Sequence, residues 1–279
     1  MWCDKRIDIV YLGWPKAGST WFHRFCEESP DLLVSSAKDT YLFSKSAGVS
    51  VESIFPDVDS SFDDTKLVEI NHDYVFSLEA LSKISAHNPN AKVVVFFREP
   101  ISWLISEYKY VTATGAVSCS FEEFLATYDY LRGRLSISEH IENVHKIFGK
   151  NNTFCYPVEH LREQPNDFAE KLCSFCDISN DFLNQYDFST SVNSAITPRL
   201  KFLPVLINFA RKVRDFTGLY RLYGLVKRGS LRKLMYSNSS SKLNYDWARS
   251  KVLLSDLNIT DEINKIENIL DFELTSWKK

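Results

Sequence analysis

The chain has 279 residues, of which 44% are hydrophobic and 25% are charged, as in ordinary globular proteins of one or two domains. Nine glycines and nine prolines are too few for a collagen-like, linker-rich or disordered chain. The net charge of −3 argues against a general nucleic-acid-binding protein, so we expect no nucleic acid partner.

Short apolar runs bounded by turn residues predict four strands, and the segments between them have helical periodicity. The predicted strands are Ile7–Leu12, Lys66–Ile70, Lys92–Phe97 and Thr153–Tyr156. The predicted helices are Thr20–Glu28, Ser77–His87, Ser102–Thr112, Phe121–Leu131, Ser138–Phe148, Asn166–Cys176 and Asp261–Leu274. This alternation predicts an α/β fold with a central parallel sheet of about five strands flanked by helices. Ligands bind at the carboxyl ends of such strands, so active residues are expected just after Leu12, Ile70 and Phe97.

The cysteines and the N-terminal residues indicate the cellular compartment. Six cysteines in a chain of this length form no recognisable disulfide framework, and the first residues lack the long apolar region of a secretory signal. We therefore predict reduced thiols and a cytoplasmic location. Cys173 and Cys176 form a single CxxC within a helical segment, without a second ligand pair at zinc spacing. We expect them to pack in the core, and we expect no metal site.

The first motif follows the first predicted strand, where Gly13–Trp21 reads GWPKAGSTW. A small-residue turn that opens a helix directs backbone N–H groups and the positive end of the helix dipole at one point. Lys16 adds a cation there, and Ser19 and Thr20 add hydroxyls. The motif is not a Walker A loop, because its lysine precedes Gly18 instead of following it. It predicts a phosphate site; the alternative is an ordinary turn with a surface lysine.

The second motif follows the strand Lys92–Phe97 and begins with Arg98-Glu99-Pro100. Proline is favourable at a helix start, so Arg98 lies at the carboxyl end of the strand, where ligands bind. Ser102 and Ser106 share one helix face. An arginine with a serine hydroxyl suits a dianionic phosphate. The alternative is an arginine that caps a strand end and a serine that faces solvent.

Both motifs resemble those of sulfotransferases that use 3′-phosphoadenosine 5′-phosphosulfate (PAPS). PKAGSTW is similar to the 5′-phosphosulfate-binding loop, and Arg98, Pro100, Ser106 and Tyr108 match the 3′-phosphate motif R-[DN]-P-x5-S-x-Y, with Glu99 in place of Asp or Asn. The resemblance implies donor binding by the loop residues Lys16, Ala17, Gly18, Ser19 and Thr20, with Trp21 near the adenine. It implies 3′-phosphate binding by Arg98 and Ser106, and Lys227-Arg228-Gly229 resembles a further 3′-phosphate loop of the family.

Two segments each contain a candidate for the catalytic base, the residue that removes the proton from the acceptor hydroxyl or amine. Lys38–Phe43 resembles a segment of carbohydrate sulfotransferases in which the acid is the base, so the resemblance implies this role for Asp39. Glu69–Tyr74 resembles a segment that lines the acceptor site and offers His72 as the other candidate. We favour Asp39; the structural alternatives are a turn residue for Asp39 and a hydrogen-bonded structural role for His72. The expected acceptor-binding residues are Tyr41, Glu69, His72 and Asp73.

Two segments have strongly unbalanced charge. Residues 199–233 hold ten Lys or Arg and one acid, whereas residues 52–79 hold eight Asp or Glu and one Lys. Each run is typical of a solvated face. The alternatives are a wall for an anionic ligand or a peripheral membrane contact for the basic segment, and an acidic rim near the acceptor for the other.

These observations predict a single sulfotransferase domain over residues 1–279, with a P-loop-like three-layer fold, cofactor motifs in 7–112 and a basic, helical part in 199–279. The expected reaction is in-line transfer of a sulfonate from PAPS to a hydroxyl or amine of a small natural product or glycan, without metal, leaving the bisphosphate PAP. The alternatives are a small-molecule kinase of the P-loop type that uses ATP and Mg²⁺, and a non-catalytic nucleotide-binding protein.

Overall fold

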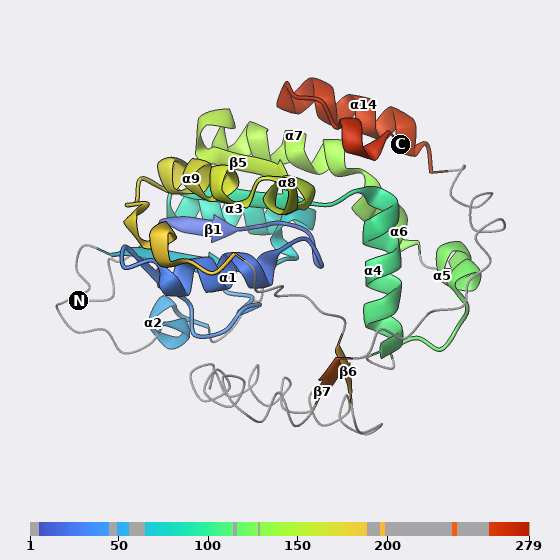
Figure 1. Ribbon diagram of the computed structural model, residues 1–279, viewed down its shortest axis with the longest axis horizontal. Helices are drawn as coiled ribbons and strands as arrows, with labels where there is room; N and C mark the ends of the chain where they lie inside the picture. The colour runs from blue at the N-terminus through green and yellow to red at the C-terminus, as the bar shows by residue number, and fades with distance from the viewer. Residues whose placement is uncertain are drawn as a thin grey trace.

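The computed structural model describes residues 6–44, 49–55, 65–113, 116–127, 129–188 and 257–278, together with the backbone of two short strands at 196–198 and 236–238. Its centre is a sheet of five parallel strands in the order β2-β3-β1-β4-β5 (Figure 1). The strands are β1 (Ile9–Tyr11), β2 (Leu32–Val34), β3 (Lys66–Ile70), β4 (Lys92–Phe97) and β5 (Thr153–Pro157). The predicted parallel sheet of about five strands is therefore confirmed.

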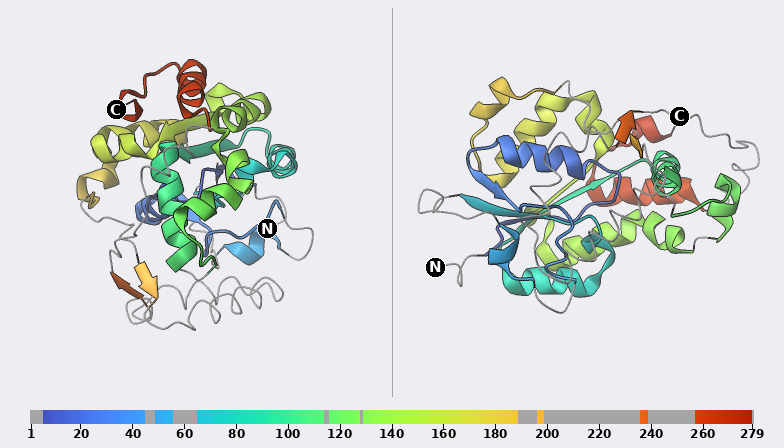
Figure 2. Two further views of the ribbon diagram at one scale, coloured as in Figure 1. Left: turned by 90° about the vertical axis from the view of Figure 1, so that its right-hand side faces the viewer. Right: turned by 90° about the horizontal axis from the view of Figure 1, so that it is seen from below.

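Helices cover both faces of the sheet. The right-hand view of Figure 2 shows α1 and α9 on one face and α3 and α7 on the other. The helices are α1 (Ser19–Glu28), α2 (Val51–Ile54), α3 (Leu78–His87), α4 (Pro100–Ala113), α5 (Phe121–Thr127), α6 (Tyr130–Leu135), α7 (Ile137–Phe148), α8 (Val158–Glu163), α9 (Pro165–Cys176) and α14 (Ile259–Leu270). Short 3₁₀ turns lie at Tyr74–Phe76, Lys150–Asn152, Asp181–Gln185 and Thr275–Trp277, and β6 (Ile196–Pro198) pairs antiparallel with β7 (Tyr236–Asn238).

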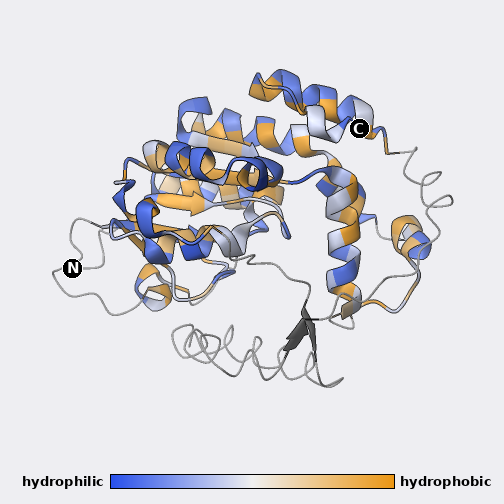
Figure 3. Cartoon of the chain, in the orientation of Figure 1, coloured by the Kyte–Doolittle hydropathy of each residue, from blue (hydrophilic) through white to orange (hydrophobic). Residues whose placement is uncertain are grey.

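The interior strand β4, which lies between β1 and β5, shows why this strand order is stable. Its last five residues, VVVFF, are fully buried, as expected for a strand covered on both faces. The ring of Phe96 packs edge-on against Tyr11 of β1 and Phe22 of α1. Figure 3 shows the sheet as the most continuous hydrophobic part of the molecule. This core fixes β1 and α1 against β4, and thereby fixes the loop between β1 and α1.

Several predicted elements differ from the observed ones. The predicted boundaries of β3 and β4 match the observed ones, but β2 and α8 were not predicted, because elements of three and six residues are too short to show a period. The predicted single helix Phe121–Leu131 is wrong: the chain forms α5 and α6 there, and Asp129 precedes the second helix. The last helix begins at Ile259, two residues before the predicted start.

Cys173 and Cys176 lie in the core, as expected, with at most 1% of their surfaces exposed. Burial raises the pKa of Cys173 to about 11 and that of Cys176 to about 12, which keeps both side chains as neutral thiols. Within the described ranges, no group of His, Cys, Asp and Glu side chains is arranged to hold a metal ion. No helix among the described residues has the length and apolar character needed to cross a membrane.

Candidate active site

The loop between β1 and α1 runs directly along the backbone of β4. The backbone N–H of Trp14 donates to the carbonyl of Phe96 at 3.0 Å. A Cβ atom on Gly13 would lie 2.5 Å from that carbonyl oxygen and 2.7 Å from the nitrogen of Phe96. Only glycine fits at this approach, so the strand that precedes Arg98 also positions the loop.

Gly18 is the N-cap of α1 and has a left-handed backbone, with φ of 97°. No side chain caps this end of the helix, and its first turn has no acidic residue. The first N–H groups of a helix lack intrahelical partners, and the helix dipole places partial positive charge there. The N-terminus of α1 therefore has the chemistry of an anion site.

Lys16 projects from this loop toward α4. Its ammonium lies 4.7 Å from the ring centre of Tyr110. Burial lowers the pKa of Lys16, the nearby carboxylate of Glu107 raises it, and Arg98 lowers it further. These neighbours place the side chain of Lys16, the predicted catalytic lysine, against α4, the helix that carries Ser106.

Three residues of the site have left-handed backbones although none is glycine: Lys16 (φ 62°), Asp39 (φ 60°) and Tyr41 (φ 58°). Such conformations cost about 1 to 3 kcal/mol each and persist where the surrounding structure enforces them. In the Asp39 loop, the backbone N–H of Asp39 donates to the carbonyl of Ile70 at 2.8 Å. The backbone thus continues the pairing of β2 with β3 and holds the Asp39 side chain at the carboxyl end of the sheet.

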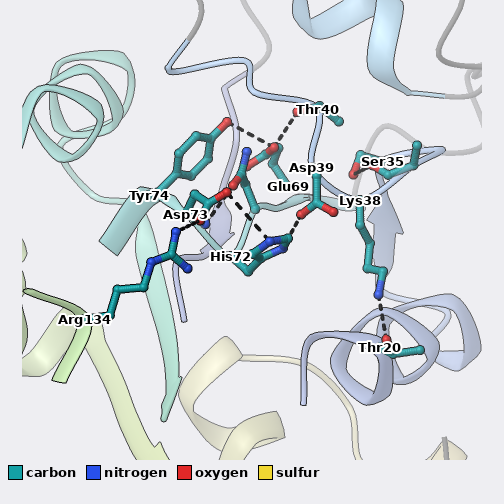
Figure 4. A network of polar contacts seen from close by, with 12 residues as sticks. Thr20, Ser35, Lys38, Asp39, Thr40, Glu69, His72, Asp73, Tyr74 and Arg134 are labelled. Atoms are coloured by element: carbon teal, nitrogen blue, oxygen red, sulfur yellow. Dashed lines mark hydrogen bonds and ion pairs between the residues drawn. The ribbon is translucent and has the colours of Figure 1, made fainter. Parts of the chain in front are cut away.

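The two candidate bases lie side by side (Figure 4). The Nδ1 atom of His72 is 2.6 Å from the Oδ1 atom of Asp39, and its Nε2 atom is 3.7 Å from the Oδ2 atom of Asp73. Arg134 of α6 in turn donates to Asp73 Oδ1 at 3.0 Å. Carboxylates therefore face both nitrogens of the imidazole. Burial disfavours the charged form of His72, but Asp39 and Asp73 outweigh burial and raise its pKa.

Glu69 lies beneath this pair and is fully buried. Its Oε1 atom accepts hydrogen bonds from the hydroxyls of Thr40 and Tyr74. Burial raises the pKa of Glu69 to about 8, although both hydroxyls act in the opposite direction. The sequence placed Glu69 among the acceptor-binding residues; the structure instead places it under the Asp39 loop, where it holds Thr40. The other expected acceptor residues, Tyr41, His72 and Asp73, are half-buried.

Arg98 follows β4, as predicted, and faces the start of α8. Its Nε atom is 3.9 Å from Oε1 of Glu159. Burial lowers the pKa of Arg98, and Arg162 lowers it further. Glu99 accepts hydrogen bonds from the backbone N–H groups of Ile101 and Ser102, so this deviation from the family motif caps α4. Ser106 lies on α4, further from its start.

Trp21, the predicted neighbour of the adenine, is 8% exposed and packs in an aromatic cluster. Its ring centre is 5.2 Å from that of Phe25, 5.8 Å from Phe168 and 6.2 Å from Tyr186. Ala17 is also buried, whereas Ser19 and Thr20 are half-buried at the start of α1. Lys227, Arg228 and Gly229, and with them the basic segment 199–233, lie outside the described residues.

Three charged residues of the site were not assigned a role from the sequence: Lys38, Glu107 and Arg134. Glu107 is 7% exposed on α4, and burial raises its pKa while Arg134 and Lys16 lower it. Arg134 stacks over the ring of Phe76, with 4.4 Å between its guanidinium carbon and the ring centre. No local sequence pattern identifies Glu107 or Arg134 as a site residue, because each reaches the site through the packing of a separate helix. Lys38 begins the segment Lys38–Phe43, and its proximity to Thr20 is visible only in the fold (Figure 4).

Comparison with known proteins gives a consistent result. The family model described as "Sulfotransferase domain" matches residues 6–195. A sulfotransferase structure from Alicyclobacillus acidocaldarius aligns with a TM-score of 0.66 and 16% identity over 99% of this chain and 100% of that chain, which shows a shared fold.

Two further solved structures align over part of this chain. A sulfotransferase domain from the curacin biosynthetic pathway aligns with a TM-score of 0.47 and 16% identity over 66% of this chain and 78% of that domain. A mouse sulfotransferase complexed with PAP aligns with a TM-score of 0.46 and 16% identity over 68% of this chain and 66% of that chain. The curated proteins gave no match.

Proposed function

The chain belongs to the sulfotransferase domain family, and from this premise we propose that it transfers the sulfonate of PAPS to a hydroxyl or amine of an acceptor. One observation carries the proposal: the Asp39–His72 pair and the N-terminus of α1 lie together at the carboxyl end of the sheet. The 2.6 Å hydrogen bond from Lys38 to Thr20 joins the two loops (Figure 4). An anion site next to a proton acceptor is the arrangement that sulfonate transfer requires.

The donor supplies the sulfonate and a good leaving group, the 5′-phosphate of PAP. In the proposed arrangement the first turn of α1, with Ala17, Gly18, Ser19 and Thr20, binds the phosphosulfate. Lys16 stabilises the negative charge that develops on the bridging oxygen when the S–O bond breaks. Arg98 and Ser106 hold the 3′-phosphate, with Trp21 toward the adenine. The positive charges of Lys16 and Arg98 would neutralise the negative charge of the donor. We therefore propose a reaction that does not depend on a metal.

Asp39 is the proposed base, and His72 is the residue that positions it. The acceptor oxygen or nitrogen forms the new bond to sulfur, and its proton passes to the Asp39 carboxylate. His72 faces Asp39 and Asp73, and both acids favour the imidazolium, which has no lone pair to accept a proton. The carboxylate is therefore the member of the pair that can accept one. His72 then orients Asp39 and offsets its charge.

The acceptor is proposed to be a small natural product or a glycan, bound by Tyr41, His72 and Asp73. The predicted cytoplasmic location remains a prediction. A small-molecule kinase of the P-loop class is less well supported, because β4 is followed directly by Arg98 instead of by an acid that could hold Mg²⁺.

The test is ligand-induced thermal stabilisation followed by a transfer assay. A ligand that binds the folded state raises the melting temperature by mass action. We expect PAP with EDTA to raise it, ATP with Mg²⁺ to have a smaller effect, and labelled PAPS to modify an acceptor in a screen. Stabilisation by ATP and Mg²⁺ alone would overturn the proposal in favour of a kinase. Stabilisation by PAP without any transfer of sulfonate from PAPS, in the wild type as in Lys16→Met, would indicate a non-catalytic nucleotide-binding protein.

A further inference from the structure

Residues 39–43 form the loop that carries the proposed base, and its backbone is strained at two positions. Asp39 and Tyr41 have left-handed backbones, with φ of 60° and 58°. Non-glycine residues rarely adopt this conformation, and it persists where the surrounding structure enforces it. The backbone N–H of Asp39 donates to the carbonyl of Ile70 at 2.8 Å. This bond fixes the start of the loop, and the rest of the loop is held from below.

Two attachments of the loop end on the same oxygen atom, Oε1 of Glu69 (Figure 4). The Thr40 hydroxyl donates to it directly. The backbone N–H of Phe43 donates to the Tyr74 hydroxyl at 3.1 Å, and that hydroxyl donates to Oε1 at 3.2 Å. The ring of Phe43 also packs edge-on against that of Tyr74, with 5.8 Å between their centres. One side chain of β3 therefore holds the loop at its second and its fifth residue.

The directions of these hydrogen bonds make Glu69 an acceptor. A backbone N–H can only donate, so Tyr74 accepts from Phe43 and directs its one hydrogen at Glu69. The Thr40 oxygen likewise accepts from the N–H of Leu42 at 3.4 Å, which leaves its hydrogen for Glu69. Oε2 of Glu69 is buried and has no hydrogen-bond partner among the described residues. The loop thus uses one oxygen of the carboxyl group and not its charge.

The surroundings of Glu69 favour its neutral acid. The side chain is fully buried, and burial costs a charged carboxylate more than a neutral acid. Burial, with a smaller contribution from the Asp39 carboxylate, raises the pKa of Glu69 to about 8 against the opposing effect of Thr40 and Tyr74. In the neutral acid Oε2 carries the proton, and Oε1 accepts both hydroxyls. This form adds no second negative charge beneath Asp39.

We propose that Glu69 is the positioning residue that keeps the carboxylate of Asp39 in contact with His72; this inference rests on the proposed function. Because Glu69 is fully buried, it acts through the loop that carries Asp39. Glu69 and His72 belong to one segment, since β3 ends at Ile70 and His72 follows two residues later. The same segment therefore holds both members of the 2.6 Å pair between Oδ1 of Asp39 and Nδ1 of His72.

The pKa of His72 reports whether Asp39 is in place. Burial lowers this pKa, Asp39 raises it through its charge and its hydrogen bond, Asp73 raises it further, and Lys38 has a smaller, lowering effect. Burial raises the pKa of Glu107 on α4, and His72 is among the cations that lower it, so Glu107 also faces this site. Lys38 would move with Asp39, but its effect is the smaller one. A relaxed loop should therefore lower the pKa of His72.

Two competing explanations differ in what they require of Glu69. In the first, Glu69 acts on His72 as a further negative charge, so an acid is needed whatever its length. In the second, the bond from the N–H of Asp39 to Ile70 holds the base without help, and Glu69 only fills the core. The proposed role instead requires an oxygen at the reach of glutamate, with or without the acid.

The experiment is an NMR titration of the histidine side chains in the free protein, and it requires no ligand. His72→Gln identifies the signal of His72 among the six histidines. In Glu69→Asp, which keeps the acid but shortens its reach, and in Glu69→Ala we expect the pKa of His72 to fall by about 0.5 or more. Glu69→Gln, which keeps an oxygen at the same reach, should stay close to the wild type. The matched control is Glu170→Asp, an exposed substitution on α9 that should leave this pKa unchanged.

The same variants test the consequence for catalysis, with PAPS and an acceptor found in the screen. A displaced base slows the chemical step, so kcat should fall about tenfold or more in Glu69→Asp and Glu69→Ala, while the KM for PAPS changes less than about threefold. Glu69→Gln should recover most of this loss.

An unchanged pKa of His72 in Glu69→Asp and Glu69→Ala would overturn this inference in favour of the Ile70 bond. A fall in Glu69→Gln without a fall in Glu69→Asp would overturn it in favour of the charge. Where Glu69→Ala does not fold, Thr40→Val takes its place, because it removes the hydroxyl that joins the loop to Glu69; an unchanged pKa of His72 in that variant would also overturn the inference. If the pKa values change as expected but no acceptor receives sulfonate from PAPS, the proposed function fails, and the role of Glu69 in holding the pair stands.

Discussion

The Nδ1 atom of His72 lies 2.6 Å from the Oδ1 atom of Asp39, although one residue follows β3 and the other follows β2. The sequence presented them as competing candidates for the same role. Their contact makes them one unit, and in the proposed mechanism the imidazole of His72 positions the carboxylate of Asp39. This unit and the α1 N-terminus are the basis of the following predictions.

Asp39→Asn should abolish most of the transfer activity while PAP still binds. An amide cannot accept the proton of the acceptor, and loss of a general base typically costs about 10² to 10⁴ in kcat. Steady-state kinetics with PAPS and calorimetry with PAP would measure the two effects separately. Asp167→Asn, an exposed substitution on α9, should change neither kcat nor the affinity for PAP. A kcat within about threefold of the wild type would mean that Asp39 is not the base.

His72→Gln should reduce stability more at low pH than at high pH. The pKa of His72 is raised in the folded protein, so the imidazolium stabilises the fold fully below the unfolded-state pKa of about 6.5. That contribution disappears as pH rises through the folded-state pKa. Urea unfolding at pH 5.5 and pH 8.5 would show a larger gap between wild type and variant at the lower pH.

The matched control for this experiment is His160→Gln. Burial lowers the pKa of His160, so the neutral ring is the favoured form in the folded protein. Its contribution should be present at pH 8.5 and disappear as pH falls through the folded-state pKa. The same direction of change in both variants would contradict the assignment for His72.

Glu69→Gln should stabilise the protein at high pH. The folded-state pKa of about 8 lies above the unfolded-state value, so wild-type stability falls as pH rises from about 4.5 to 8. Glutamine keeps an oxygen that accepts from Thr40 and Tyr74 but cannot ionise. We expect similar urea midpoints for the two proteins at pH 4.5 and a gain on the order of a few kcal/mol for the variant at pH 8.5. Exposed Glu170→Gln should show no such trend, and a pH-independent difference at Glu69 would refute its neutral state.

Arg98→Ala should weaken the binding of PAP selectively. If Arg98 holds the 3′-phosphate, its removal should cost about 10- to 100-fold in PAP affinity, as expected for a charge-assisted hydrogen bond. Adenosine 5′-phosphate, which has no 3′-phosphate, should bind the variant and the wild type almost equally. Calorimetry with the two ligands measures this difference. Arg24→Ala, on the exposed face of α1 and paired with Glu28, is the control, and equal losses for both ligands in Arg98→Ala would exclude the 3′-phosphate role.

Gly18→Ala should destabilise the fold by about 1 to 3 kcal/mol and weaken PAP binding. The residue has φ of 97°, and a new Cβ atom would lie 3.2 Å from side-chain carbons of Phe96 and Val158. Gly133→Ala is an informative control, because a Cβ atom there meets nothing within 4 Å and alanine favours the helix. That variant should gain up to about 1 kcal/mol in urea unfolding. An unchanged free energy of unfolding in Gly18→Ala would show that the loop does not need the left-handed backbone conformation of Gly18.

Much of the sheet and part of the site could be predicted because their signals are local. The apolar runs of β3 and β4 identified both strands with their boundaries, and the turn chemistry of Gly18 identified the helix start at α1. Arg98 was placed correctly at a strand end because proline follows two residues later. The signal failed for β2, which is too short to show a period, and for the separation of α5 from α6.

The sequence by itself determined the composition of the site: a glycine-bounded loop with Lys16, an arginine at the end of a buried strand, and two candidate bases. Only the tertiary structure decided which side chains meet. It joined Asp39 to His72, buried Glu69 beneath them, and brought Lys38 to Thr20. These contacts depend on the strand order β2-β3-β1-β4-β5, which places the ends of β2, β3 and β1 next to one another. Periodicity and turn residues describe neighbours along the chain, whereas strand order is set by how the hydrophobic faces of all the elements pack together.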